Sequence, residues 1–203
     1  MKPGLLDILA CPICKYYPLK LYIFKWETSE GTFKHLINII SSSNYDKLVE
    51  FIKNMNQELY VKLENEVISD EIIREPNSKQ DYLKELCEKK ETIDSITDLS
   101  DTESKEILKL IQNNYFEKFK VEIDVNKILM ELNSFNWLLF GTEIENGIIF
   151  CEKCKRWYPI DETIPQMLPD ELRAKKKEKI FLQKWKTHIP DTILKEGVPF
   201  NLK

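Results

Sequence analysis

Glycine and histidine are scarce in this chain of 203 residues, which has five glycines and two histidines. It contains no Gly-rich phosphate loop, no nucleotide-binding fingerprint and no Ser-based nucleophile motif. Neither histidine is placed to act as a base, because His35 lies in an apolar strand pattern and His188 lies in a basic tail. The carboxylates are numerous but scattered, so we assign no active site, and a metal-dependent enzyme or redox protein stays open only through the cysteine thiols.

Long apolar runs are also missing. No run approaches the roughly 18 residues that a membrane span requires, and the opening segment MKPGLLDILACP is too short and too interrupted, at Asp7, for a signal peptide. We therefore expect a cytoplasmic protein that makes no contact with a membrane. Because the cytosol is reducing, paired cysteines in such a protein bind metal more often than they form disulfides.

Four of the five cysteines form two Cys-x-x-Cys pairs, CPIC and CEKC, one near each end of the chain. Each pair can bind one ion through both sulfurs, and two pairs complete a tetrahedron at roughly 2.3 Å per Zn–S bond. Four protein ligands close the coordination shell, so the sequence predicts a structural zinc site. A rubredoxin-like iron site, disulfides, and cysteines that no longer bind metal remain as alternatives. The predicted metal ligands are Cys11, Cys14, Cys151 and Cys154.

The residue after each pair is a lysine, Lys15 or Lys155. Many zinc knuckles have glycine there, because a left-handed backbone conformation relieves the turn. Lysine can adopt this conformation at modest cost, and its charge offsets part of the charge of four thiolates. The fifth cysteine, Cys87, has the helical spacing of a buried apolar residue.

Strand patterns occur near both ends of the chain. At each end, a short turn sequence between two consecutive strands predicts a hairpin. The first predicted hairpin lies around Ser29–Gly31. The second lies at Asn146–Gly147, because both positions tolerate positive φ. The predicted strands, which alternate between apolar and polar residues or are rich in β-branched and aromatic ones, are 16–27, 32–40, 135–145 and 148–160.

The middle of the chain is mostly helical in pattern. Ser43, the capping-box pair Ser100 and Glu103, and Asp124 are predicted to start helices. Residues 58–73 fit a strand or a helix equally well. Residues 4–10 are predicted to form a short helix or a turn. The other predicted helices are 43–55, 79–90, 100–116 and 125–133, a basic helix that ends before Pro190, and a short one that ends near Gly197.

These patterns predict an α+β fold in three parts. A small zinc-ribbon-like β domain is built from both chain ends, residues 1–40 and 134–172. A mostly helical insertion, residues 41–133, separates its two halves. A basic C-terminal tail, residues 173–203, follows it.

Charge is distributed unevenly along the chain. Residues 46–131 contain 13 basic and 21 acidic residues, a net of −8, whereas residues 173–203 contain nine basic and three acidic residues, a net of +6. The tail lysines alternate with Phe181 and Trp185, so the tail could contact RNA. A stand-alone RNA-binding zinc ribbon is therefore an alternative function. The other interpretation of the tail is a solvated helix whose aromatic side docks on the rest of the chain.

The segment after the second cysteine pair is unusually apolar for the surroundings of a small metal site. It can form part of the core of the zinc domain. It can also be an exposed edge that binds another protein, because methionine and aromatic residues are typical of interface centres. Its candidate partner-binding residues are Trp157, Tyr158, Ile164, Pro165, Met167 and Leu168.

The segments LLDILACPIC and NGIIFCEKCKRWYPIDETIPQMLPDEL, separated by a helical insertion, resemble one family of proteins. This is the family of small zinc-binding activator subunits shared by tRNA, rRNA and translation-factor methyltransferases. The resemblance implies a non-catalytic protein that forms a heterodimer with S-adenosylmethionine-dependent methyltransferases. It would cover an apolar surface on them, extend their sheet and keep them active. It also implies that the four paired cysteines hold the zinc, and that the six residues after them face the partner.

Overall fold

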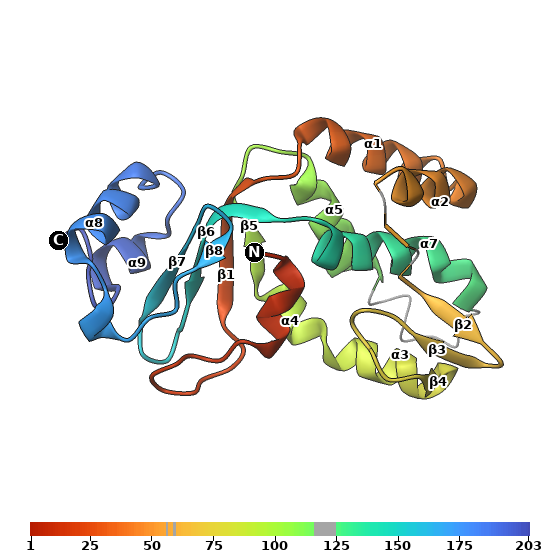
Figure 1. Ribbon diagram of the computed structural model, residues 1–203, viewed down its shortest axis with the longest axis horizontal. Coiled ribbons are helices and arrows are strands. Elements are labelled where there is room, and N and C mark those ends of the chain that lie inside the picture. Colours follow the sequence, from red (N-terminus) through yellow and green to blue (C-terminus); the bar gives the residue numbers. More distant parts are fainter. Residues whose placement is uncertain (56, 59, 116–124) are drawn as a thin grey trace.

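A five-stranded mixed sheet occupies the centre of the molecule (Figure 1). The computed structural model describes residues 1–55, 57–58, 60–115 and 125–203. The strand order is β5-β1-β6-β7-β8; β5 pairs with β1 in parallel and the other pairs are antiparallel. The predicted α+β class is thereby confirmed. The strands are β1 (Lys20–Trp26), β5 (Ile96–Asp98), β6 (Ile144–Phe150), β7 (Trp157–Asp161) and β8 (Ile164–Pro165).

The register of β1 and β6 brings the two ends of the chain together. Lys20, the first residue of β1, lies opposite Phe150, the last residue of β6. The first cysteine pair precedes β1 and the second follows β6, so both pairs lie at the same end of the sheet.

Both faces of the sheet are covered, and successive residues of a strand point to opposite faces. On β1, Leu21 and Ile23 belong to a large core, whereas Phe24 belongs to a second, smaller one. On β7, Tyr158 faces the large core and Trp157 the smaller one. Strands that are buried on both faces read as continuous apolar runs, as IIF in β6 does.

Helices from the middle of the chain pack on the large core together with the 3-10 helix η1 (Pro3–Ile8). Segment 41–133 also contributes β5 to the central sheet, and its helices share one core with residues from both ends of the chain. The helices are α1 (Glu30–Ser41), α2 (Tyr45–Asn54), α3 (Lys79–Glu88), α4 (Lys90–Asp94), α5 (Ser104–Leu110) and α7 (Val125–Asn136), with π-helical turns η2 (Ile111–Tyr115) and η3 (Trp137–Gly141).

The C-terminal segment covers the other face of the sheet with two helices, α8 (Lys175–Lys184) and α9 (Asp191–Glu196) (Figure 1). Both were predicted, and a 3-10 turn η4 (Asp170–Leu172) precedes them. Phe181 and Leu182 of α8 are buried against the sheet. The indole of Trp157 donates a hydrogen bond to the carbonyl of Phe200 at 2.8 Å. The structure thus docks the aromatic side of α8 on the sheet, and it leaves the RNA contact of the tail as a prediction.

Two predicted strands are helices in the structure. Residues 32–40 lie in α1, which Ser29 caps through a hydrogen bond from the Thr32 amide, so the predicted hairpin at 29–31 is wrong. Within α1, Phe33, Leu36 and Ile39 are buried at helical spacing. Residues 135–141 complete α7 and η3, and only the last part of the predicted strand 135–145 enters β6.

The predicted hairpin at Asn146–Gly147 is also wrong, because both residues lie inside β6. A Cβ on Gly147 would lie 2.6 Å from the Tyr22 carbonyl oxygen, so glycine serves the close approach of β1 there. The tight turn with positive φ occurs instead at Glu162 and Thr163, between β7 and β8.

Two predicted helices begin at other residues, or with other capping residues, than the sequence predicted. Asn44, not Ser43, caps α2, and Ser100 bonds to Asp98 instead of capping α5. Asp124 lies outside the described residues. In the ambiguous stretch 58–73 the chain forms two strands of a small three-stranded sheet. Its strands are β2 (Lys62–Glu64), β3 (Val67–Ser69) and β4 (Asn77–Ser78).

Candidate metal centre

Two tight turns carry the paired cysteines. In the first turn, the Lys15 amide donates to the Cys11 carbonyl at 2.9 Å. In the second, the Cys151 amide donates to the Arg156 carbonyl at 2.8 Å. Lys15 and Lys155 have φ values of 58° and 59°, in the left-handed region. Both turns therefore adopt the conformation for which zinc knuckles often use glycine, with lysine in its place.

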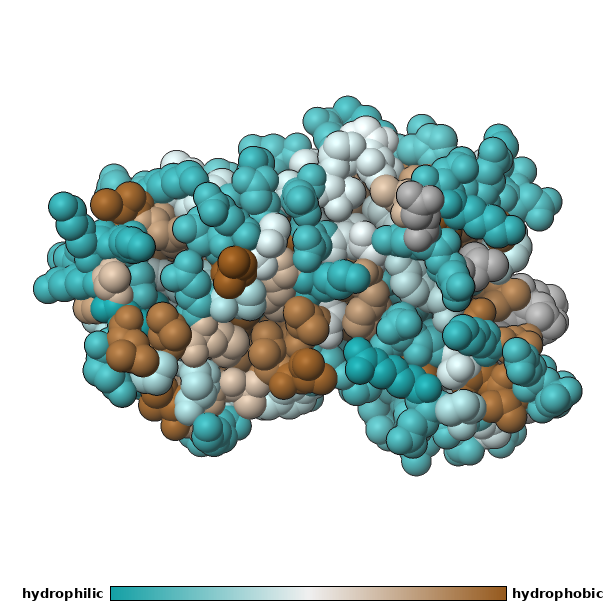
Figure 2. All heavy atoms as spheres, in the orientation of Figure 1, coloured by the Kyte–Doolittle hydropathy of each residue, from teal (hydrophilic) through white to brown (hydrophobic). Residues whose placement is uncertain are grey.

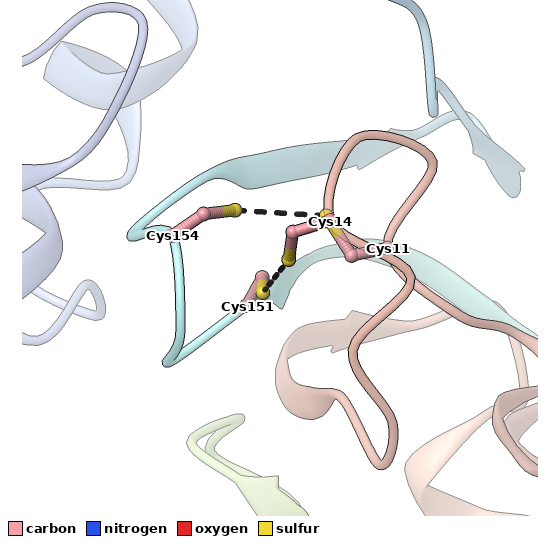
Figure 3. Close-up of side chains that lie close together, drawn as sticks. All are labelled: Cys11, Cys14, Cys151 and Cys154. Atoms are coloured by element: carbon pink, nitrogen blue, oxygen red, sulfur yellow. Dashed lines mark hydrogen bonds between the residues drawn. The ribbon is translucent and has the colours of Figure 1, made fainter.

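The four sulfurs of the two turns converge on one point (Figure 3). All four Sγ atoms lie within 4.8 Å of one another. Cys11 Sγ lies 3.6 Å from Cys154 Sγ, and Cys14 Sγ lies 3.5 Å from Cys151 Sγ. These separations exceed a disulfide bond of about 2.05 Å. The structure thus brings together the four ligands that the sequence predicted.

The sulfur arrangement fits one tetrahedral ion. Four sulfurs at about 2.3 Å from a zinc ion lie about 3.8 Å apart along each edge of the tetrahedron. The two shortest sulfur separations here, 3.5 and 3.6 Å, are close to that edge. Cys11 and Cys151 are buried, and Cys14 and Cys154 are half-buried. A bound ion would have four protein ligands and no open position, so it would connect the two turns and supply no reaction chemistry.

The protein environment shifts the pKa values of the two buried thiols, Cys11 and Cys151, in opposite directions. Burial raises the pKa of Cys151 to about 12. Burial also opposes ionisation of Cys11, but hydrogen bonds from the Cys14 amide and the Tyr158 hydroxyl outweigh it and lower that pKa to about 6. One thiolate is therefore favoured before any cation binds, whereas ionisation of Cys151 depends on the cation.

Tyr158 is a supporting residue of this site that the sequence did not identify as such. Its hydroxyl lies 3.4 Å from Cys11 Sγ, and its side chain is fully buried. The guanidinium of Arg173 lies 5.4 Å from the centre of the Tyr158 ring and 4.9 Å from that of Trp157. Arg173 is itself buried and paired with Glu178. The only signal in the sequence was an aromatic pair three residues after the second cysteine pair.

The six candidate partner-binding residues divide into two groups. Trp157 is fully buried under the C-terminal segment, and Tyr158 is fully buried beside the sulfurs. In this structure neither side chain is accessible to a partner protein. Ile164 is 63% exposed and Leu168 42% exposed. Pro165 and Met167, with partial exposure, complete the second group.

The two histidines and the fifth cysteine lie far from the paired cysteines in the sequence and pack against other side chains. His35 is exposed on α1, where its ring stacks on Phe51 at 5.5 Å, and is not a strand residue. His188 is half-buried beside Phe24 and Trp185. Cys87 packs at half exposure against the large core.

Fold and site together define the class of protein: an α+β chain whose two ends meet at a zinc-knuckle-like site of four cysteines, with a helical middle between them. Residues 2–162 match the Trm112p-like protein family, and the chain belongs to that family, whose members are non-catalytic activator subunits of methyltransferases. No curated protein and no solved structure matches the chain. Residues 163–203 lie beyond the family match. Among the described residues, every helix is too short or too polar to traverse a lipid bilayer.

Proposed function

We propose that this chain binds, stabilises and activates S-adenosylmethionine-dependent methyltransferases that act on tRNA, rRNA or a translation release factor in the cytoplasm. It does so as the non-catalytic partner of a heterodimer, with one structural zinc ion on Cys11, Cys14, Cys151 and Cys154. The observation that carries the proposal is the family match over residues 2–162, which spans both cysteine turns. Family membership favours this function over a stand-alone RNA-binding zinc ribbon.

The proposed partner-binding surface lies at the edge of the central sheet. β8 is the end strand of that sheet and pairs only with β7 within the described chain. An end strand presents backbone groups to a partner's strand, but Pro165 offers a carbonyl and no N–H, so apolar side chains must supply much of the contact. The surface is formed by Ile164, Pro165, Met167 and Leu168.

Further apolar side chains are exposed on η1, which follows the first residues of the chain. The amino group of Met1 donates to the carbonyl of Thr163 at 2.5 Å, which places the first residue of the chain beside the start of β8. On η1, Ile8 is 71% exposed and Leu5 37% exposed. Figure 2 shows apolar side chains gathered on the lower central part of this face. An exposed apolar group of this kind is typical of a protein interface.

Native purification of the tagged full chain tests the proposal. The wild-type chain should recover methyltransferases and contain one zinc per chain. The double variant Ile164→Asp/Leu168→Asp should recover at least tenfold less methyltransferase, because it places two charges in an apolar interface. The control Val67→Asp changes a side chain that is 38% exposed on the small sheet, and it should leave recovery unchanged. Absence of any methyltransferase from the wild-type preparation would contradict the proposal.

A further inference from the structure

The surface of the C-terminal segment is mainly cationic. Of its three acidic residues, Glu178 pairs with the buried Arg173 at 2.5 Å, Asp191 pairs with Lys195, and Glu196 is exposed. Asp191 also faces Lys186, since its pKa is lowered first by Lys195 and then by Lys186. Six lysines of the segment form no ion pair with any residue that the structure describes. They are Lys175, Lys176, Lys177, Lys179, Lys184 and Lys186.

Docking of α8 holds three of these lysines outward. Phe181 and Leu182 fix the helix to the sheet, and the Phe181 ring stacks on Trp157 at 6.3 Å. Lys175–Lys177 form the first turn of α8 and are exposed. Their direction is therefore set by a packed helix and not by a flexible tail.

The position of these lysines is unfavourable for the helix itself. The N-terminus of a helix carries partial positive charge, so acidic side chains stabilise the first turn and lysines destabilise it. The first turn of α8 has one acidic residue, Glu178, which is paired with Arg173, and three consecutive lysines that oppose the local preference for acidic residues. A local conflict of this kind is expected where a side chain serves binding, and a bound anion removes it.

The charge of the molecule is polarised along its length. Residues 46–131 carry a net −8, and the helices and strands α2, α3, β2, β3 and β4 of this segment lie toward the opposite end of the longest axis from α8 and α9 (Figure 1). An extended anion is attracted to one end and repelled by the other, so it meets the molecule in a preferred orientation.

We infer that Lys175–Lys177, with the neighbouring lysines of the C-terminal segment, bind the phosphate backbone of RNA. This inference rests on the proposed function, because the RNA would be the substrate of the partner methyltransferase. Lysines act as point charges toward phosphates and read no bases, so the contact adds affinity without sequence preference.

Two other partner classes fit the surface less well. A membrane-binding helix needs an exposed apolar face, but the apolar side of α8 is docked on the sheet. Protein interfaces depend on tryptophan, tyrosine and arginine at their centres and are depleted in lysine. The first turn of α8 exposes three lysines, and its one acidic residue, Glu178, is buried.

The test compares two triple charge reversals in the full chain. One variant carries Lys175→Glu, Lys176→Glu and Lys177→Glu; because glutamate favours a helix N-terminus, α8 should stay folded. The control carries Lys47→Glu, Lys62→Glu and Lys84→Glu, three exposed lysines of the helical middle, and has the same net charge. Thermal unfolding should show all three proteins folded.

Binding of unfractionated tRNA is measured by fluorescence anisotropy at several salt concentrations. The α8 variant should bind at least tenfold more weakly than wild type at about 0.1 M salt, with a salt slope smaller by about 2, as expected for three lost phosphate contacts. The control should stay within about twofold of wild type. Equal affinities of the α8 variant and wild type, or equal losses in both variants, would overturn the inference.

Two further readouts distinguish RNA binding from protein binding and from membrane binding. If the α8 variant keeps tRNA binding but no longer recovers a methyltransferase, the surface is a protein interface and the inference is wrong. Binding of phosphatidylserine vesicles that depends on the three lysines and that tRNA does not compete away would also overturn it. The proposed function fails separately, when the wild-type chain recovers no methyltransferase although its tRNA binding depends on the three lysines.

Discussion

Individual residues at the two cysteine turns show how the chain prepares a site for a cation. The Tyr158 hydroxyl and the Cys14 amide stabilise a thiolate at Cys11, while Cys151 lies where burial disfavours charge. Lys15 and Lys155 bring positive charge to each turn in a backbone conformation that usually requires glycine. The residues around the sulfurs thus compensate part of the charge of four thiolates, and a divalent ion compensates more.

Replacement of one metal ligand should remove the ion and destabilise the fold. For Cys151→Ser we expect loss of the bound zinc and a fall in Tm of about 10 °C, which corresponds to about 3 kcal/mol or more at this chain length. Metal analysis and thermal unfolding measure both. Cys87→Ser is the matched control, because Cys87 packs against the core far from the sulfurs in sequence and should leave one zinc per chain. Full zinc content in Cys151→Ser would contradict the four-thiolate assignment.

The sequence predicts the metal ligands better than the residues that support them. The spacing of the two Cys-x-x-Cys pairs is enough to predict a metal site. Tyr158 contacts Cys11, which is 147 residues away in the chain, and Arg173 of the C-terminal segment contacts the Tyr158 ring in the sheet. No local sequence pattern indicates contacts of this kind. Trp157 and Tyr158 look like surface candidates in sequence because nothing there shows that the C-terminal segment covers one and the sulfurs the other.

At the scale of elements, the errors of prediction have physical causes. Residues 32–40 are rich in β-branched and aromatic residues, yet Phe33, Leu36 and Ile39 bury at helical spacing, so tertiary packing overrides strand propensity. The stretch around Trp137 is buried all round and shows no period that separates helix from strand. Helices with a clear polar face, such as α2, α3 and α8, were predicted correctly.

Docking of α8 on the sheet should depend on its buried face. Phe181→Ala should lower the free energy of unfolding by about 3 kcal/mol, because it empties a packed position beside Trp157 and Phe24. The neighbouring change Ile180→Ala should cost less than about 0.5 kcal/mol, since Ile180 is 59% exposed. Urea unfolding followed by tryptophan fluorescence measures both. Similar losses from the two changes would contradict the docked arrangement of α8.

For the whole molecule, the site of four cysteines closes a loop that contains all of the helical middle, residues 41–133. The sheet alone already aligns the two cysteine turns, because Lys20 lies opposite Phe150. A bound ion would therefore stabilise an arrangement that the core also favours, and its removal should loosen the turns more than the helices around the large core.

Metal affinity of the whole chain should fall as the pH falls. Binding displaces at least the proton of Cys151, whose pKa is about 12, so the apparent affinity should drop about tenfold or more per pH unit between pH 8 and 7. Cys11, with a pKa of about 6, is already ionised there and adds to the loss only below about pH 6. Competition with a chelator at several pH values measures this. An affinity independent of pH would contradict binding by thiolates.

The separation of the two cysteine pairs also sets an order of events during synthesis. Cys14 and Cys151 are 137 residues apart, so at about 5–20 residues per second the first pair waits roughly 7–30 s for the second. In the last part of that interval, after residue 98 has been made, β1 has its parallel neighbour β5 but not yet β6. The first cysteine pair is thus synthesised long before the second pair. Its two thiols must stay reduced until translation supplies the other two.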